Sequence, residues 1–294
     1  MSNFLNLLAA GVTAGAIYGV FAACIAIWFR VSNVLNLAIG DFAMLGVLGV
    51  AELSQVDHWN LAVSILVDLV GVGLLAWLFD WLVLHFALDR GQADHGIVTV
   101  FCYTFALSLG IEGVTLAVLG TDVRSAPAFW NGPALEVADF HVQRAGLLVI
   151  GLAIVVGILL WTYLRTTVSG RAASACGESV IGSRIVGIDA ARYRRWLFVA
   201  TAVLAALFGI VESPMNGFTY SSGPTISLLG VVAAGFAAFR RPGRAVVIGL
   251  VLGIAEALIG GYVSTSYNDV ILYAALFALI VFQPRVLGLS TVPT

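Results

Sequence analysis

Carboxyl side chains occur within long apolar stretches of this sequence. The acids that we consider inside or at the ends of such stretches are Asp41, Asp68, Asp80, Glu112, Glu212 and Glu256. A charge at the middle of a bilayer costs about 2.5–3.5 kcal/mol on insertion scales, so intramembrane acids usually face a bundle interior or an aqueous path. Two kinds of chemistry remain open for each acid: a polar lining for a moving solute, or a hydrogen bond that joins neighbouring helices.

Depth in the apolar stretches separates these acids. Asp80 and Glu212 lie near the ends of their stretches, so we expect them to reach water. Glu256 is the deepest in its stretch, and no arginine falls at a matching depth to pair with it. We therefore expect Glu256 mainly to hold neighbouring helices by hydrogen bonding, although it stays a candidate for the solute path.

Other reactive residue types show no catalytic or metal-binding spacing. The histidines sit at loop ends without ligand spacing: they are His58, His85, His95 and His141. No nucleotide-binding motif is present either. We expect no catalytic residue, no metal site and no cofactor bound by this chain, and an intramembrane enzyme has no support.

The arginines of the sequence are concentrated in one stretch. Six of the fourteen basic residues fall between Arg165 and Arg195, and lysine is absent. Basic loops of membrane proteins stay on the cytoplasmic side. We therefore predict that 165–195 is a cytoplasmic loop and the place where a soluble partner binds.

The elements that position these residues are predicted to be membrane-spanning helices. The chain is 61% hydrophobic and 10% charged, whereas soluble domains average about 25% charged residues. A span needs about 20 apolar residues. Nine stretches are candidates: 4–29, 37–53, 61–87, 96–119, 145–164, 196–213, 225–239, 245–262 and 269–284. Of these, 37–53 and 225–239 are short enough to be re-entrant or broken helices. We predict an all-α polytopic membrane protein, a single domain over 1–294 with about 8–10 transmembrane or re-entrant helices and no nucleic-acid partner.

The distribution of arginines among the loops indicates the orientation of the spans in the membrane. With 165–195 inside, the inside loops hold twelve of the fourteen arginines, and only Arg124 and Arg144 fall outside. We expect a multi-pass protein of the cytoplasmic membrane, with its N-terminus outside and its C-terminus inside.

Glycines repeat at four-residue spacing within two spans. Gly11, Gly15 and Gly19 form one series, and Gly249 with Gly253 forms another. Small residues at this spacing favour close packing of helices in a membrane, so we predict contact faces here.

Two segments interrupt the apolar pattern, at 30–36 and at 213–224, where Pro224 is placed to begin a helix. Interrupted helices in a bilayer need protein or a water-filled cavity around them, and in transporters their ends often face the substrate. A sharp turn at the membrane surface is the alternative. The candidates for lining a solute path are Asn36, Asp41, Glu112, Thr225, Ser227 and Glu256.

The run Asn33–Gly46 resembles the signature of the permease subunits of branched-chain amino acid ABC importers, the LivH type. The resemblance continues through Thr104–Gly110, Gly170–Ala172, Ala175, Gly187–Asp189 and Gln283–Gly288. Two features depart from the family pattern. Ile39 replaces the usual histidine, and the usual glycine-rich run appears as the bulky, basic segment Gly235–Arg244.

The resemblance implies an importer subunit that works beside several partners. These would be a second permease, homologous or a copy of the chain, two ATPase subunits that carry ATP and Mg, and an extracytoplasmic substrate-binding protein. It also implies that 165–195 contains a coupling helix for the ATPase, which we place at Arg171–Ile185 with Ser169 as its cap. The coupling residues implied are Arg171, Ala172, Ala175, Cys176, Gly187 and Asp189.

One alternative stays open on the residues alone. A stand-alone secondary transporter or channel, for a small solute such as urea or an amide, would need its own coupling-ion site. Asp41, Glu112 and Glu256 are the acids that would supply it.

Overall fold

The computed structural model describes residues 2–84, 96–127, 135–137, 140–142, 144–178, 180–185, 187–239 and 241–262, with Ala274, Phe277 and Ala278. The first half contains α1 (Ser2–Ser32), α2 (Ile39–Ala51), α3 (Leu61–Phe79) and α5 (Gly96–Leu119). The π-helical segments η1 (Glu52–Val56) and η2 (Asp80–Leu84) continue α2 and α3. An antiparallel hairpin follows, formed by β1 (Leu135–Val137) and β2 (Phe140–Val142). The second half contains α6 (Arg144–Thr166), α7 (Val168–Glu178), α8 (Val180–Ile185), α9 (Ala190–Glu212), α10 (Ser222–Phe236) and α11 (Pro242–Tyr262).

Membrane spans dominate this fold. Among the described residues, seven helical stretches are long and apolar enough to cross a membrane, and α10 is a shorter apolar helix. The prediction of an all-α polytopic membrane protein is confirmed, with the small hairpin as an addition that the sequence pattern did not predict. Each of the first eight predicted stretches coincides with a helix. The ninth, 269–284, lies outside the described residues except at three isolated positions.

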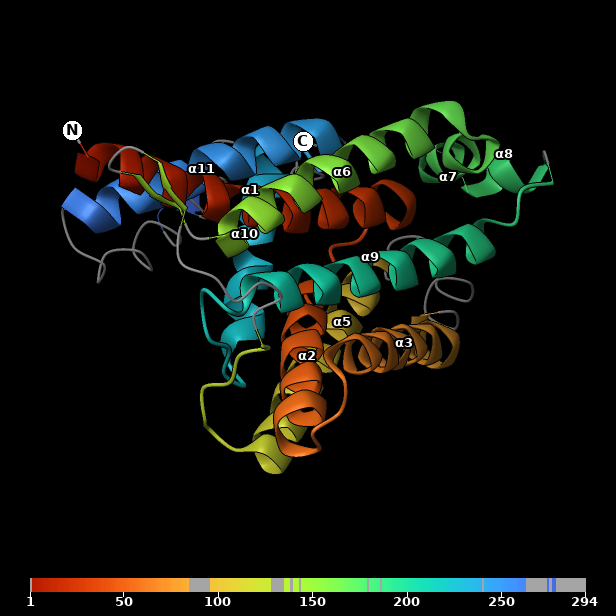
Figure 1. Cartoon of the computed structure of the whole chain (residues 1–294). Helices are drawn as coiled ribbons and strands as arrows, with labels where there is room; N and C mark the ends of the chain where they lie inside the picture. The colour runs from red at the N-terminus through yellow and green to blue at the C-terminus, as the bar shows by residue number, and fades with distance from the viewer. Residues whose placement is uncertain are drawn as a thin grey trace.

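α1 is largely buried within the bundle, and α6, α9 and α11 run alongside it (Figure 1). The glycine series of α1 and α11 face each other. A Cβ at Gly15 would lie 2.7 Å from Leu250 Cα, and one at Gly11 would lie 2.8 Å from Ile254 Cα. Later residues of α1 meet earlier residues of α11, so the two helices are antiparallel. The two backbones therefore touch as the glycine spacing predicted.

α2 crosses this group at a steep angle beside α9 (Figure 1). Small residues make the crossing close: a Cβ at Gly46 would lie 2.8 Å from Ala206 Cβ, and one at Gly209 would lie 2.6 Å from the Ala43 carbonyl oxygen. The crossing places the beginning of α2 inside the bundle, where it meets α10.

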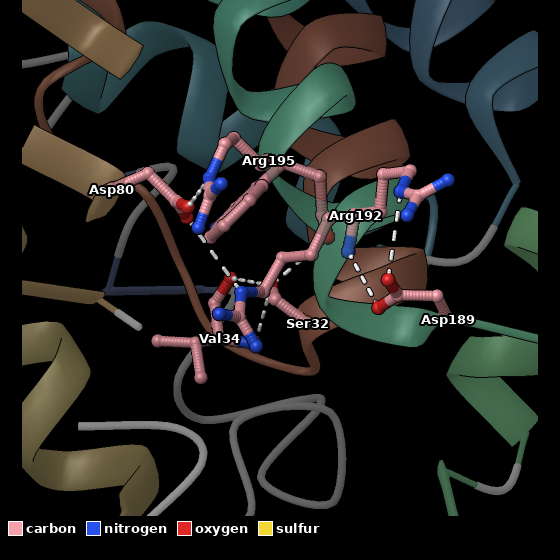
Figure 2. A network of polar contacts seen from close by, with 8 residues as sticks. Ser32, Val34, Asp80, Asp189, Arg192 and Arg195 are labelled. Atoms are coloured by element: carbon pink, nitrogen blue, oxygen red, sulfur yellow. Dashed lines mark hydrogen bonds and ion pairs between the residues drawn. The ribbon is translucent and has the colours of Figure 1, made fainter. Parts of the chain in front are cut away.

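An ion-pair cluster joins the end of α3 to α9. Asp80 Oδ2 accepts a hydrogen bond from Arg195 Nε at 2.8 Å, and Arg194 Nε lies 3.7 Å from Oδ1. Figure 2 shows Arg195 reaching from α9 to Asp80. The Asp80 side chain is fully buried and Glu212 is 7% exposed. The expectation that both reach water was wrong, because these helix ends pack against neighbouring helices.

Candidate functional site

The N-terminal ends of α2 and α10 meet within the bundle, at a place that we call the junction. The backbone N–H of Gly40 donates a hydrogen bond to Ser227 Oγ at 2.9 Å. The N–H of Ala38 donates to Asn36 Oδ1 at 3.0 Å, which holds the turn before α2. A Cβ at Gly40 would lie 2.8 Å from Ser227 Oγ, so the close approach depends on glycine. The two predicted interruptions of the apolar pattern therefore come together at one polar place.

Asp41 lies at the junction and is fully buried. A Cβ at Gly223 would lie 2.9 Å from Asp41 Cα, so this acid sits against the first turn of α10. The first N–H groups of a helix have no partner within it and carry partial positive charge, which favours an anion. Among the described residues, the carboxylate oxygens of Asp41 and Nδ2 of Asn36 have no direct hydrogen-bond partner. Such buried groups cost about 1–3 kcal/mol each, so stability alone would not favour them here.

One face of α5 completes the junction with polar groups. Thr104 and Ser108 are buried on α5, and Glu112 follows one turn later. Thr104 Oγ1 donates a hydrogen bond to the Leu35 carbonyl oxygen at 3.3 Å. Ser108 and Glu112 lie close enough to Asp41 to interact with its carboxyl group. Glu112 was predicted from the sequence to line a solute path. The hydroxyl groups of Thr104 and Ser108 were not, although their four-residue spacing indicated a shared helix face.

Two predicted path residues lie elsewhere in the described structure. Glu256 on α11 hydrogen-bonds to Tyr18 of α1 and lies near Glu212 at the end of α9. Asn216 Nδ2 donates to Glu212 Oε1 at 3.4 Å, so these residues form a second polar cluster. Thr225 is exposed on α10. The predicted residues that the structure brings to the junction are Asn36, Asp41, Glu112 and Ser227, and their role in a solute path stays a prediction.

The basic stretch 165–195 contains two short helices, α7 and α8, between α6 and α9. From the sequence we expected one helix over Arg171–Ile185 with Ser169 as its cap. The expected start was wrong: Thr167 Oγ1 accepts a hydrogen bond from the Gly170 N–H at 2.9 Å, so Thr167 is the cap. The helix consequently begins at Val168, one turn earlier than expected.

α7 has an inward and an outward face. Cys176 is 1% exposed and packs against α1 and α9, and Ala172 is also buried. Val168, Arg171 and Ala175 are exposed at spacings of three and four residues, which places them on one stripe. Of the residues implied in coupling, Arg171 and Ala175 are therefore accessible to a partner, whereas Ala172 and Cys176 hold α7 to the bundle.

The last part of the stretch sets the entry into α9. Gly187 has φ +81°, a conformation that favours glycine. Asp189 is the N-cap of α9, since its Oδ1 accepts a hydrogen bond from the Arg192 N–H at 3.1 Å. Arg192 Nε also lies 3.5 Å from Asp189 Oδ2 (Figure 2). Both residues thus have a structural role that does not require a partner.

The amino-acid sequence can now be compared with known proteins. Residues 7–280 match the model of the family described as the permease component of branched-chain amino acid transport systems. The chain belongs to this family. The match extends from the first turns of α1 to beyond α11, so the junction and the basic stretch 165–195 both lie within the matched region.

Several curated permeases of this kind are similar to the chain. The high-affinity branched-chain amino acid transport system permease protein LivH of Escherichia coli strain K12 is 24% identical over 96% of this chain and 94% of its own length. A probable branched-chain amino acid transport permease protein LivH of Methanocaldococcus jannaschii is 24% identical over 95% of the chain and 85% of its own. The BraD permease of Pseudomonas aeruginosa is 20% identical over 96% and 94%. The chain is thus similar to these permeases along most of their length.

Proposed function

We propose that this permease translocates a small zwitterionic solute, most simply a branched-chain amino acid, as a subunit of an ABC importer. The observation that carries the proposal is the junction, where two helix N-termini and a buried carboxyl group meet in a membrane domain. The names of the similar permeases support the choice of amino acid.

The junction offers complementary partners for both charges of an amino acid. The first turns of α2 and α10 present partial positive charge suited to a carboxylate. Asp41, with Glu112 behind it, offers negative charge suited to an ammonium group. Since a zwitterion carries balanced charges, transport needs polar contacts at the junction and no relay of protons.

The proposed importer contains partners that supply energy and substrate. Two ATPase subunits would bind ATP and Mg, and an extracytoplasmic binding protein would deliver the solute. A second permease, a homologue or a copy of this chain, would complete the membrane domain. The exposed stripe Val168, Arg171 and Ala175 on α7 is the surface we assign to the ATPase.

Uptake measurements in proteoliposomes test this function. The permease reconstituted with its ATPase subunits and binding protein should accumulate radiolabelled leucine when ATP is present on the ATPase side, and urea should not compete. Uptake of leucine without ATPase subunits, driven by a proton or sodium gradient, would instead favour the secondary transporter.

The proposed orientation predicts the location of loops. A reporter fused after Thr294, or inserted in the α7–α8 stretch, should report the cytoplasm, because arginines resist translocation. A reporter inserted at 121–127, before the hairpin, should report the outside. If the insertions at α7–α8 and at 121–127 report the same side, the orientation is contradicted.

Ala175→Trp should uncouple ATP hydrolysis from uptake. The side chain at this position is exposed on α7, so tryptophan leaves the fold intact but blocks close approach of a partner. We expect uptake to fall about tenfold or more, which is the size of loss caused by changing one hot-spot residue of an interface. The ATPase subunits should still copurify with the permease or hydrolyse ATP.

Val118→Trp is the matched control, because Val118 is 74% exposed near the other end of the bundle, on α5. This variant should transport normally. Equal impairment by both tryptophans would indicate a general defect, and normal uptake by Ala175→Trp would place the ATPase contact elsewhere.

A further inference from the structure

A cavity of about 620 Å³ lies at one end of the bundle, away from the junction. It is formed by α1, α6, α7 and the beginning of α11. Four of its lining residues are arginines: Arg30, Arg165, Arg241 and Arg244. No acidic residue is among the lining residues, so the cavity concentrates positive charge.

The four arginines occupy one level of the membrane domain. Arg30 is in the last turn of α1 and Arg165 in the last turn of α6, whereas Arg244 is in the first turn of α11. They therefore mark the surface at which three spans end. Within the described part of the chain none of the four forms an ion pair, and Arg165 stacks over the Trp161 ring at 4.8 Å.

The remaining wall of the cavity is apolar. Ala23, Leu160, Leu164 and Val246 line it together with Gly157. The outer faces of the flanking helices α6 and α11 are also apolar and exposed: Ile154, Ile158, Leu159, Val247 and Val251 are all more than half exposed. An occupant thus meets arginines at the membrane surface and hydrocarbon toward the membrane interior.

We propose that this cavity binds an anionic glycerophospholipid, with its phosphate at the arginines and an acyl chain along the exposed apolar faces of α6 and α11. Charge complementarity supports this occupant, since clustered basic residues at helix ends attract anionic headgroups. A second copy of the chain fits poorly, because it would bring the same four arginines against these four. Water-soluble anions would leave the apolar wall unused.

The cavity also contacts α7, the helix whose exposed stripe we assign to the ATPase. Ser174 and Gly177 of α7 line the same cavity, and Asn33 Nδ2 at the end of α1 donates a hydrogen bond to the Gly177 carbonyl oxygen at 3.2 Å. A bound phosphate would therefore join α7 to α6 and α11 by electrostatic contacts. The lipid should stabilise the position of α7, whichever solute the permease carries.

Native mass spectrometry of the full-length chain, purified with its partner subunits and delipidated, tests the site. Dioleoyl-phosphatidylglycerol and dioleoyl-phosphatidylcholine serve as the probes. We expect phosphatidylglycerol to bind about tenfold tighter, and Arg165→Ala/Arg244→Ala to remove that preference without changing phosphatidylcholine binding. Arg165→Lys/Arg244→Lys should keep most of it, and Arg192→Ala, an exposed arginine outside the cavity, should keep all of it. If the alanine variant does not assemble, Arg165→Gln/Arg244→Gln provides the same test.

Four results would overturn the proposal. One is equal binding of the two lipids by the wild-type complex. Another is an unchanged preference in the charge-removing variants. The third is full displacement of phosphatidylglycerol by millimolar inorganic phosphate, which would mark a site for a soluble anion. The fourth is binding by the isolated chain but not by the assembled complex, because a protein neighbour would then cover the cavity.

Discussion

Asp41→Asn should reduce solute uptake about 10- to 100-fold, the range expected from losing a charged hydrogen bond of about 1.5–3 kcal/mol. Asparagine has nearly the same shape as aspartate, so the packing of α2 against α10 should survive. The negative charge that we assign to the ammonium group of the solute would be lost. The initial rate of leucine uptake by the reconstituted importer measures the effect, and thermal stability of the purified complex shows whether assembly is intact.

Glu256→Gln is the matched control, because it makes the same carboxyl-to-amide change within another span. Glutamine can still hydrogen-bond to Tyr18, so uptake should stay close to that of the wild type. If Glu256→Gln abolishes uptake in a well-assembled complex and Asp41→Asn does not, the path passes the second polar cluster. A proton-coupled mechanism would then gain support.

Asp80→Ala should have the largest effect on stability. It removes the buried partner of Arg195, whose side chain is 25% exposed, and the neighbour of Arg194, whose guanidinium group would remain in the interior. Loss of one partner of a buried ion pair costs about 3–5 kcal/mol. Denaturant unfolding in mixed micelles measures this loss of stability as a decrease in the free energy of unfolding.

Arg192→Ala provides the comparison for Asp80→Ala. Arg192 also pairs with an aspartate, but its side chain is 74% exposed, and exposed pairs contribute about 0–1 kcal/mol. A small effect of Asp80→Ala, similar to that of Arg192→Ala, would show that water reaches the cluster. A double variant with Arg195→Met should recover part of the lost stability, because one unpaired charge is removed.

Sequence patterns predicted the spans well because most of the apolar stretches have the length that a bilayer demands. The same patterns contain no information on how helices cross. Asp80 illustrates this: its place near the end of an apolar stretch indicated contact with water, whereas the arginines of α9 cover it. The partner belongs to a helix more than a hundred residues away, and only the packing brings the two together.

The residues of the candidate site were likewise predicted only in part from the sequence. Asn36, Asp41 and Ser227 were predicted from polar groups at interruptions, and the structure places them together. Thr225 has the same residue character as Ser227 but is exposed, because neighbouring positions on a helix face different directions. The hydroxyls of α5 were missed because no interruption marks that helix. On α7, the pattern of small residues did not reveal which of them face inward.

The close contact of α1 with α11 has a consequence for how the protein is made. The glycine face of α1 leaves the ribosome first, and the matching face of α11 is synthesised more than two hundred residues later. During most of translation the first helix therefore lies in the bilayer without its final neighbour. Only a chain synthesised through α11 can close that gap, so products that terminate before α11 keep the glycine face of α1 uncovered.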